Sequence, residues 1–146
     1  MNINKVIIEN FGLYNGLQEI NLQTNKLQNI ILIGGKNGNG KTTLFEAIRF
    51  CLYGPAMFEK RPTSKEYDTY LRERIHHNQK EKPQAKHAKI EIEFDHAELG
   101  RREIYIVSRE WEIVDSDIKE KLIVMHCDST VWQEWMETDH RHRILI

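Results

Sequence analysis

The stretch GGKNGNGKTT, at residues 34–43, carries the clearest chemistry in the sequence. Residues 35–42 fit the pattern G-x-x-x-x-G-K-[ST] at every fixed position. Successive backbone N–H groups of such a loop turn inward around an anion, and glycines keep side chains out of the way. Lys41 could reach the β- and γ-phosphates, and the Thr42 hydroxyl could be one ligand of Mg²⁺. The predicted nucleotide-binding residues are Gly35, Lys36, Asn37, Gly38, Asn39, Gly40, Lys41, Thr42 and Thr43.

The segments on either side of this loop have the character that a phosphate site needs. Residues 29–33 (NIILI) are almost continuously apolar, which predicts a strand covered on both faces of a sheet. After the loop, apolar side chains recur at helical spacing, and Gly54 and Pro55 then predict the end of the helix. Cys51 falls on the apolar stripe and is predicted to pack. The alternative to nucleotide binding is a glycine-rich turn that binds nothing.

The remaining sequence predicts strands on both sides of a charged insert. Residues 4–9 and 17–22 predict an antiparallel hairpin that turns at Asn15-Gly16. Residues 87–95, 104–111 and 121–127 predict three more strands, and Trp132 and Trp135 are spaced as in a terminal helix. We expect one lobe over residues 1–146. It comprises residues 1–58 (hairpin, phosphate loop and helix), a basic insert at residues 59–89, and residues 90–146 (strands and terminal helix).

Length and composition restrict the classes of protein. The 146 residues suit a single domain, and 40% hydrophobic residues exclude a fully disordered chain. Two cysteines are too few for a disulfide scaffold, and the sequence predicts a cytoplasmic protein without a membrane span. The net charge is −1, but residues 59–89 hold nine basic and five acidic side chains. Their cations are either a DNA-backbone contact or a solvated surface. The candidate contacts are Lys60, Arg61, Lys65, Arg72 and Arg74.

Hydrolysis would need a carboxylate to hold Mg²⁺ from a second side. Asp128, after the apolar run LIVMHC, is the better candidate, and Asp95 is the weaker one because its strand alternates with glutamates. Asp128 could equally belong to a turn with Ser129 and Thr130. No histidine or cysteine spacing is typical of a zinc site, so the predicted metal is Mg²⁺ carried by the nucleotide. No residue is assigned a catalytic role.

The loop G-x-N-G-x-G-K-T-T followed by LFEAIR resembles the ABC-class ATPases of the SMC and RecF type, and the opening VIIENFGLYNG is similar to their start. Within that group, IILIGGKNGNGKTTLFEAIRFCLYG most resembles the DndD family of DNA phosphorothioation (DNA sulfur modification) systems. The resemblance implies an α/β fold, the N-terminal lobe of an SMC-like head, in which an antiparallel sheet packs against the strand and helix of the phosphate loop. It implies ATP and Mg²⁺ as cofactors.

The resemblance also implies partners. They are DNA, the remaining head lobe or a second ATPase head, and other DNA sulfur-modification proteins. Because no Walker B strand or signature motif follows, we expect an N-terminal piece that binds ATP rather than turning it over alone. Two alternatives stay open: the ATPase of an SMC-like DNA-repair nuclease complex, and a small self-contained P-loop NTPase that uses Asp128.

Overall fold

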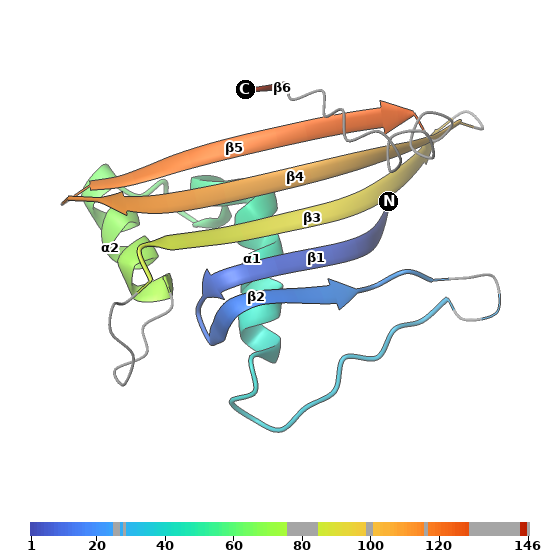
Figure 1. Ribbon diagram of the computed structural model, residues 1–146, viewed down its shortest axis with the longest axis horizontal. Helices are drawn as coiled ribbons and strands as arrows, with labels where there is room; N and C mark the ends of the chain where they lie inside the picture. Colours follow the sequence, from blue (N-terminus) through green and yellow to red (C-terminus); the bar gives the residue numbers. More distant parts are fainter. Residues whose placement is uncertain are drawn as a thin grey trace.

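The computed structural model describes residues 1–24, 27, 29–75, 85–98, 101–115, 117–128 and 144–145. Within them, an antiparallel sheet of six strands has the order β2-β1-β3-β4-β5-β6. The strands are β1 (Asn2–Phe11), β2 (Tyr14–Asn21), β3 (His87–Glu98), β4 (Arg101–Val114), β5 (Asp117–Asp128) and β6 (Ile144–Leu145). Figure 1 shows the long strands β3, β4 and β5 side by side.

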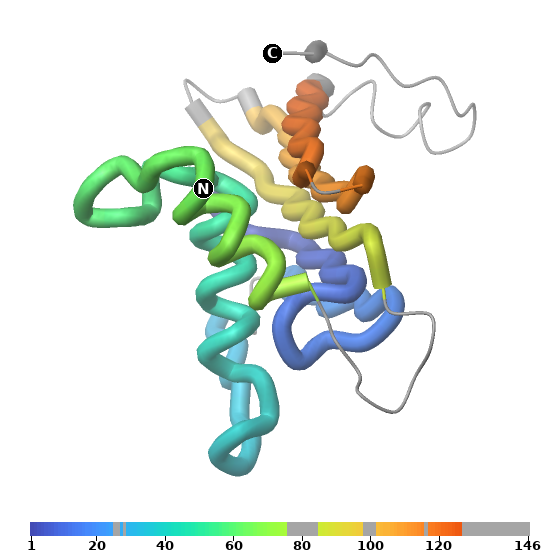
Figure 2. The backbone as a smooth tube through the Cα atoms, turned by 90° about the vertical axis from the view of Figure 1, so that its left-hand side faces the viewer, coloured from blue at the N-terminus to red at the C-terminus, as the bar shows by residue number. Residues whose placement is uncertain are grey.

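Two helices cover one face of this sheet. They are α1 (Lys41–Tyr53), which continues into the short 3-10 helix η1 (Gly54–Met57), and α2 (Ser64–Arg74). Figure 2 shows both on the same side of the strands. Neither is long and apolar enough to cross a membrane, and this finding concerns the described part of the chain.

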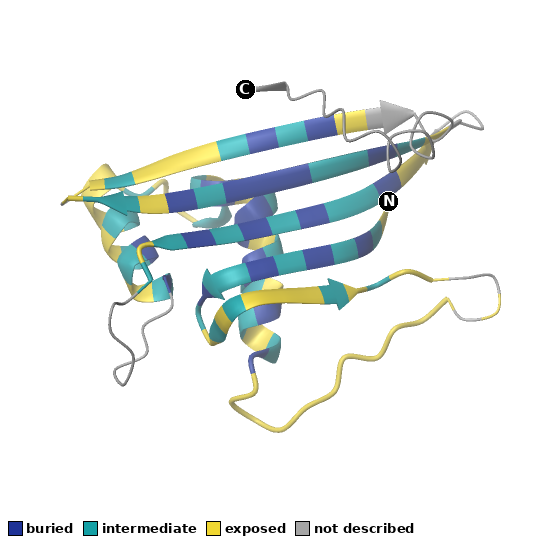
Figure 3. Cartoon of the chain, viewed as in Figure 1, coloured by how far each residue is buried: buried dark blue, intermediate teal, exposed yellow. Residues whose placement is uncertain are grey.

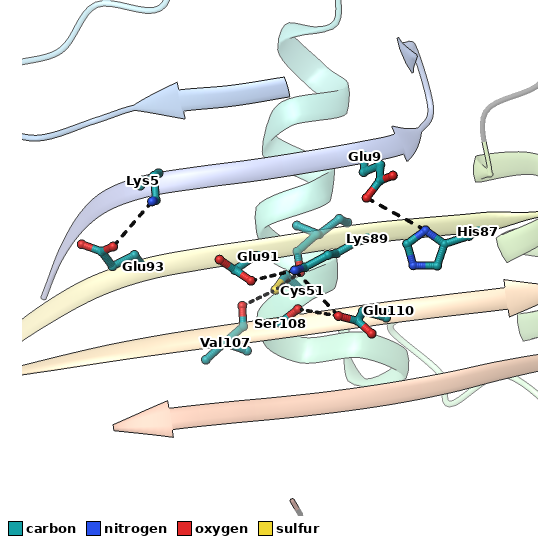
Figure 4. Close-up of polar contacts among 11 residues, drawn as sticks. Lys5, Glu9, Cys51, His87, Lys89, Glu91, Glu93, Val107, Ser108 and Glu110 are labelled. Atoms are coloured by element: carbon teal, nitrogen blue, oxygen red, sulfur yellow. Dashed lines mark hydrogen bonds and ion pairs between the residues drawn. The ribbon is translucent and has the colours of Figure 1, made fainter. Parts of the chain in front are cut away.

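The alternation of side chains along the strands explains why one face is covered. Ile90 and Ile92 of β3 are fully buried, whereas Glu91 between them and Lys89 before them point to the other face. The buried face packs against Leu44, Ala47, Phe50 and Cys51 of α1. The opposite face carries ion pairs between neighbouring strands, such as Lys89–Glu110 at 3.8 Å and Lys5–Glu93 at 4.0 Å (Figure 4).

An aromatic cluster fixes α1 on the sheet. The ring centroids of Phe50 and Trp111 lie 5.2 Å apart, and Phe11 stacks on both of them at 6.0 and 5.9 Å. All three side chains are at most 1% exposed. Trp111 is therefore a core residue, and Cys51, which is also fully buried, packs as the sequence predicted.

A charged side chain of β4 caps the C-terminal end of α1. The Arg109 guanidinium donates through Nε to the carbonyl of Cys51 and also binds the Glu120 carboxylate. Glu120 accepts a further hydrogen bond from the Tyr67 hydroxyl of α2 at 2.7 Å. A cation at the C-terminal end of a helix opposes the helix dipole and satisfies a carbonyl that has no partner within the helix.

Most of the predicted elements form, but two predictions are wrong. The hairpin turns at Gly12-Leu13, where Phe11 pairs with Tyr14, and Asn15-Gly16 lie inside β2. Gly12 has a φ of +57° and its Cα lies against Thr43, so only glycine fits there. The other correction concerns residues 29–33 and is described below. The terminal helix predicted around Trp132 and Trp135 lies outside the described residues.

Candidate functional site: the phosphate loop

The phosphate loop leads directly into α1, as predicted. Gly38 and Gly40 both have a φ of +84°, which glycine adopts without strain. Gly40 is the N-cap residue of α1. No side chain caps this end, and the first turn contains no acidic residue. The first N–H groups of a helix point outward and carry partial positive charge, so this end suits an anion.

The Lys41 ammonium lies against the loop that precedes it. Its Nζ donates to the carbonyl oxygens of Gly35 at 2.6 Å and Lys36 at 2.8 Å. The loop is closed further by a hydrogen bond from the N–H of Asn39 to the carbonyl of Lys36, at 3.3 Å. Residues 35–41 thus curl around one cationic group. Phosphate oxygens are stronger partners for an ammonium than neutral carbonyls, so a bound phosphate chain could replace both contacts.

The residues of this site fit a nucleoside triphosphate with Mg²⁺. The backbone at Gly38 has nothing within 4 Å of an added Cβ, which leaves open space beside the loop. Thr42 is exposed in the first turn of α1, where its hydroxyl is accessible to a metal ion. The donors available are backbone N–H groups, one ammonium and one hydroxyl, which is the set that a phosphate chain with Mg²⁺ needs.

The hairpin turn between β1 and β2 packs against the end of the phosphate loop and the first turn of α1. The sequence did not predict this contact. The Tyr14 hydroxyl donates to the carbonyl of Gly40 at 3.2 Å. A Cβ on Gly12 would stand 2.4 Å from Cγ2 of Thr43, so the turn touches the first turn of α1. Burial raises the pKa of Tyr14, which keeps its hydroxyl protonated and able to donate. The sequence predicts the hairpin but places its turn at Asn15-Gly16, so it does not indicate the contact between Tyr14 and Gly40.

α2 holds the same turn from the other side. The N–H of Gly12 donates to the carbonyl of Arg74 at 2.5 Å, and the Arg74 guanidinium pairs with Glu46 of α1 at 3.6 Å. The guanidinium also stacks over the Tyr70 ring at 4.7 Å. Arg74, one of the five predicted DNA contacts, is therefore engaged in packing α2 against α1.

Three of the other predicted DNA contacts lie toward the opposite end of α1. Lys60 and Arg61 are exposed in the loop after η1, and Lys65 is exposed in the first turn of α2. Arg72 is partly exposed near the end of α2. The 13 residues of α1 span about 20 Å, which separates the exposed cations from the phosphate loop.

The strand predicted at residues 29–33 does not form. These residues are assigned to no strand, Ile30 is 83% exposed and Leu32 is 93% exposed. Figure 3 shows this exposed stretch apart from the sheet, running back below β2 to the start of α1. A strand that is apolar on both faces needs neighbouring strands and an apolar layer on each side. In the described part of the chain, α1 covers only the single apolar face of the antiparallel sheet, and no second layer is present.

Neither predicted magnesium carboxylate lies near the loop. The loop contacts the hairpin turn at residues 12–14, at the end of β1. Asp95 pairs with Asn2 at the start of β1. A rise of ~3.3 Å per residue puts these two ends of the strand about 30 Å apart. Asp128 pairs with Glu103 at that same distant end of the sheet. Burial would raise the pKa of Asp95, but hydrogen bonds from Arg102 and Asn2 hold it below its ordinary value. Within the described residues, no three His, Cys, Asp or Glu side chains could hold a metal.

Comparison with known proteins agrees with the loop chemistry. A search of curated proteins gave no match. A family model described as an AAA domain matches residues 5–138, which includes the hairpin, the phosphate loop, both helices and the long strands. Because the match covers most of the chain, the chain belongs to this AAA-domain family of ATPases, of the SMC and RecF type.

Proposed function

We propose that the chain is the ATP-binding lobe of an SMC-like ATPase that acts on DNA. The observation that carries this proposal is the loop at residues 35–42, which wraps around the Lys41 ammonium and leads into an uncapped helix N-terminus. ATP would take the place of the Gly35 and Lys36 carbonyls as partner of Lys41. Thr42 would bind the Mg²⁺ that accompanies the nucleotide.

The exposed segment at residues 29–33 supports a second part of the proposal. Its five residues would become a central strand when the remaining head lobe or a second ATPase head supplies neighbouring strands. Ile30 and Leu32 would then be buried against an apolar layer. This proposal explains why an apolar run stands exposed beside a phosphate loop.

The chain alone should bind ATP without appreciable turnover. Asp95 and Asp128 lie at the distant end of the sheet, which disfavours a self-contained NTPase that uses Asp128. A steady-state phosphate-release assay should therefore give a rate close to that of buffer. Ordinary turnover that is abolished by Lys41→Ala would contradict this part of the proposal.

DNA contact is proposed for the exposed cations Lys60, Arg61 and Lys65. Contacts to phosphates weaken steeply as salt rises, because counterions are released on binding. The triple alanine variant should lose retention on DNA and its salt dependence, whereas Lys119→Ala with Lys121→Ala, on exposed positions of β5, should not. Retention that is independent of salt would contradict the contact.

The cellular role that we propose is DNA sulfur modification. The string from residue 30 to residue 54 resembles the DndD ATPases of phosphorothioation systems, and this resemblance is the support for the role. Cells that lack the protein should lose phosphorothioate linkages, measured as dinucleotides in nuclease-digested DNA by mass spectrometry. Unchanged linkages together with sensitivity to double-strand breaks would favour the repair-nuclease alternative.

A further inference from the structure

We propose that Tyr14 is a positioning residue for the triphosphate, acting through the peptide bond between Gly40 and Lys41. This inference rests on the proposed function, because it concerns the same phosphate loop. Tyr14 belongs to β2 and lies 26 residues before the carbonyl that it contacts. It is half-buried, and its ring lies over Gly40.

The Gly40 carbonyl has two donors. The N–H of Leu44 donates to it at 2.8 Å, in the first hydrogen bond of α1, and the Tyr14 hydroxyl donates at 3.2 Å. A carbonyl oxygen has two lone pairs, so these donors satisfy it fully. The orientation of the carbonyl is therefore fixed from two directions, one along the helix and one from the hairpin.

Because the peptide bond is planar, fixing the Gly40 carbonyl also fixes the direction of the Lys41 N–H. In a planar trans peptide, the C=O of Gly40 and the N–H of Lys41 point in opposite directions. When the carbonyl is held toward Leu44 and Tyr14, the N–H of Lys41 points out of the helix, toward the loop at residues 35–39. That N–H is one of the donors that the motif offers to phosphate oxygens.

The ring of Tyr14 also explains why position 40 must be glycine. A Cβ there would stand 3.3 Å from the Tyr14 hydroxyl oxygen and 3.4 Å from Cζ, and the φ of +84° already disfavours other residues. Tyr14 therefore contacts the loop at the one point where the backbone leaves the loop and enters α1. Removal of its hydroxyl should leave the fold intact and loosen this peptide.

The test compares Tyr14→Phe with the wild-type chain in calorimetric titrations with two probes, MgATP and inorganic tripolyphosphate. We expect both affinities to fall by the same factor, roughly two- to tenfold, which corresponds to one hydrogen bond. Tyr53→Phe, at an exposed tyrosine of α1, is the matched control and should leave both unchanged. Replacement of Tyr14 by 4-aminophenylalanine, which restores a donor, should recover most of the affinity.

The results distinguish positioning of the triphosphate by Tyr14 from ATP binding by the loop itself. Unchanged affinities in Tyr14→Phe would overturn it, as would a loss for MgATP alone, because Tyr14 would then act on the base or the ribose. A structural role alone would lower the unfolding temperature equally with and without tripolyphosphate, whereas positioning also shrinks the shift that tripolyphosphate produces. If the wild-type chain binds neither probe, the proposed function itself is wrong.

Discussion

The exposed leucine at position 32 offers a direct test of the unexpected conformation of residues 29–33. Leu32 is 93% exposed, whereas Leu44, on the buried face of α1, is 4% exposed. Full burial of a leucine side chain contributes about 1.5–3 kcal/mol, so the small covered fraction of Leu32 contributes only about 0.2 kcal/mol. Leu32→Ala should therefore change the free energy of unfolding by less than about 0.5 kcal/mol.

Leu44→Ala is the matched control, because the same atoms are removed from a packed site. It should cost about 2–5 kcal/mol through lost transfer energy and the cavity that remains. Urea unfolding followed by circular dichroism measures both variants against the wild-type chain. If Leu32→Ala also costs 2 kcal/mol or more, residues 29–33 are buried in solution and the account of the exposed segment is wrong. A partner that completes the sheet should make Leu32→Ala costly only in its presence.

Three further changes test the packing around both helices. Burial raises the pKa of the Cys51 thiol from 9.0 to about 12. The neutral thiol therefore contributes its full stability below pH 9, and this contribution falls as pH rises toward 12. Urea unfolding should show that the free energy of unfolding drops by about 1 kcal/mol by pH 10, and it should fall less steeply with pH in Cys51→Ala. Gly54→Ala should cost about 2 kcal/mol or more in the same assay, because φ is +51° and the new Cβ would stand 2.7 Å from a guanidinium nitrogen of Arg109; an unchanged midpoint would contradict this. Thr63→Ala removes the capping box of α2 and should cost about 1 kcal/mol, whereas Thr69→Ala, inside the helix, should cost clearly less.

The sequence predicted those elements whose signal is local. Helix α1 follows from apolar spacing and its Gly-Pro end, and β3 follows from strict alternation around Ile90 and Ile92. The apolar run at residues 29–33 indicates a strand equally well, but a strand also needs neighbours. Its apolar side chains indicate a strand that is buried on both faces. The described residues supply neither the neighbouring strands nor the second apolar layer that such a strand needs.

The site was predictable where a motif fixes it and unpredictable where tertiary contacts do. The glycine conformations at Gly38 and Gly40 and the position of Lys41 follow from the loop pattern. The contact of Tyr14 with Gly40 depends on the hairpin register, and nothing in the residue types indicates it. The ion pair of Arg74 with Glu46 was unpredictable for the same reason, since a count of charges does not indicate which of them pair.

Nucleotide binding at residues 35–42 can be measured by calorimetric titration of the chain with MgATP, beside Lys41→Ala. We expect saturable binding at one site per chain in the wild type and its loss in the variant, because the variant lacks the ammonium that the loop surrounds. Equal heats of binding in both proteins, or none in the wild type, would contradict the claim that residues 35–42 form a triphosphate site.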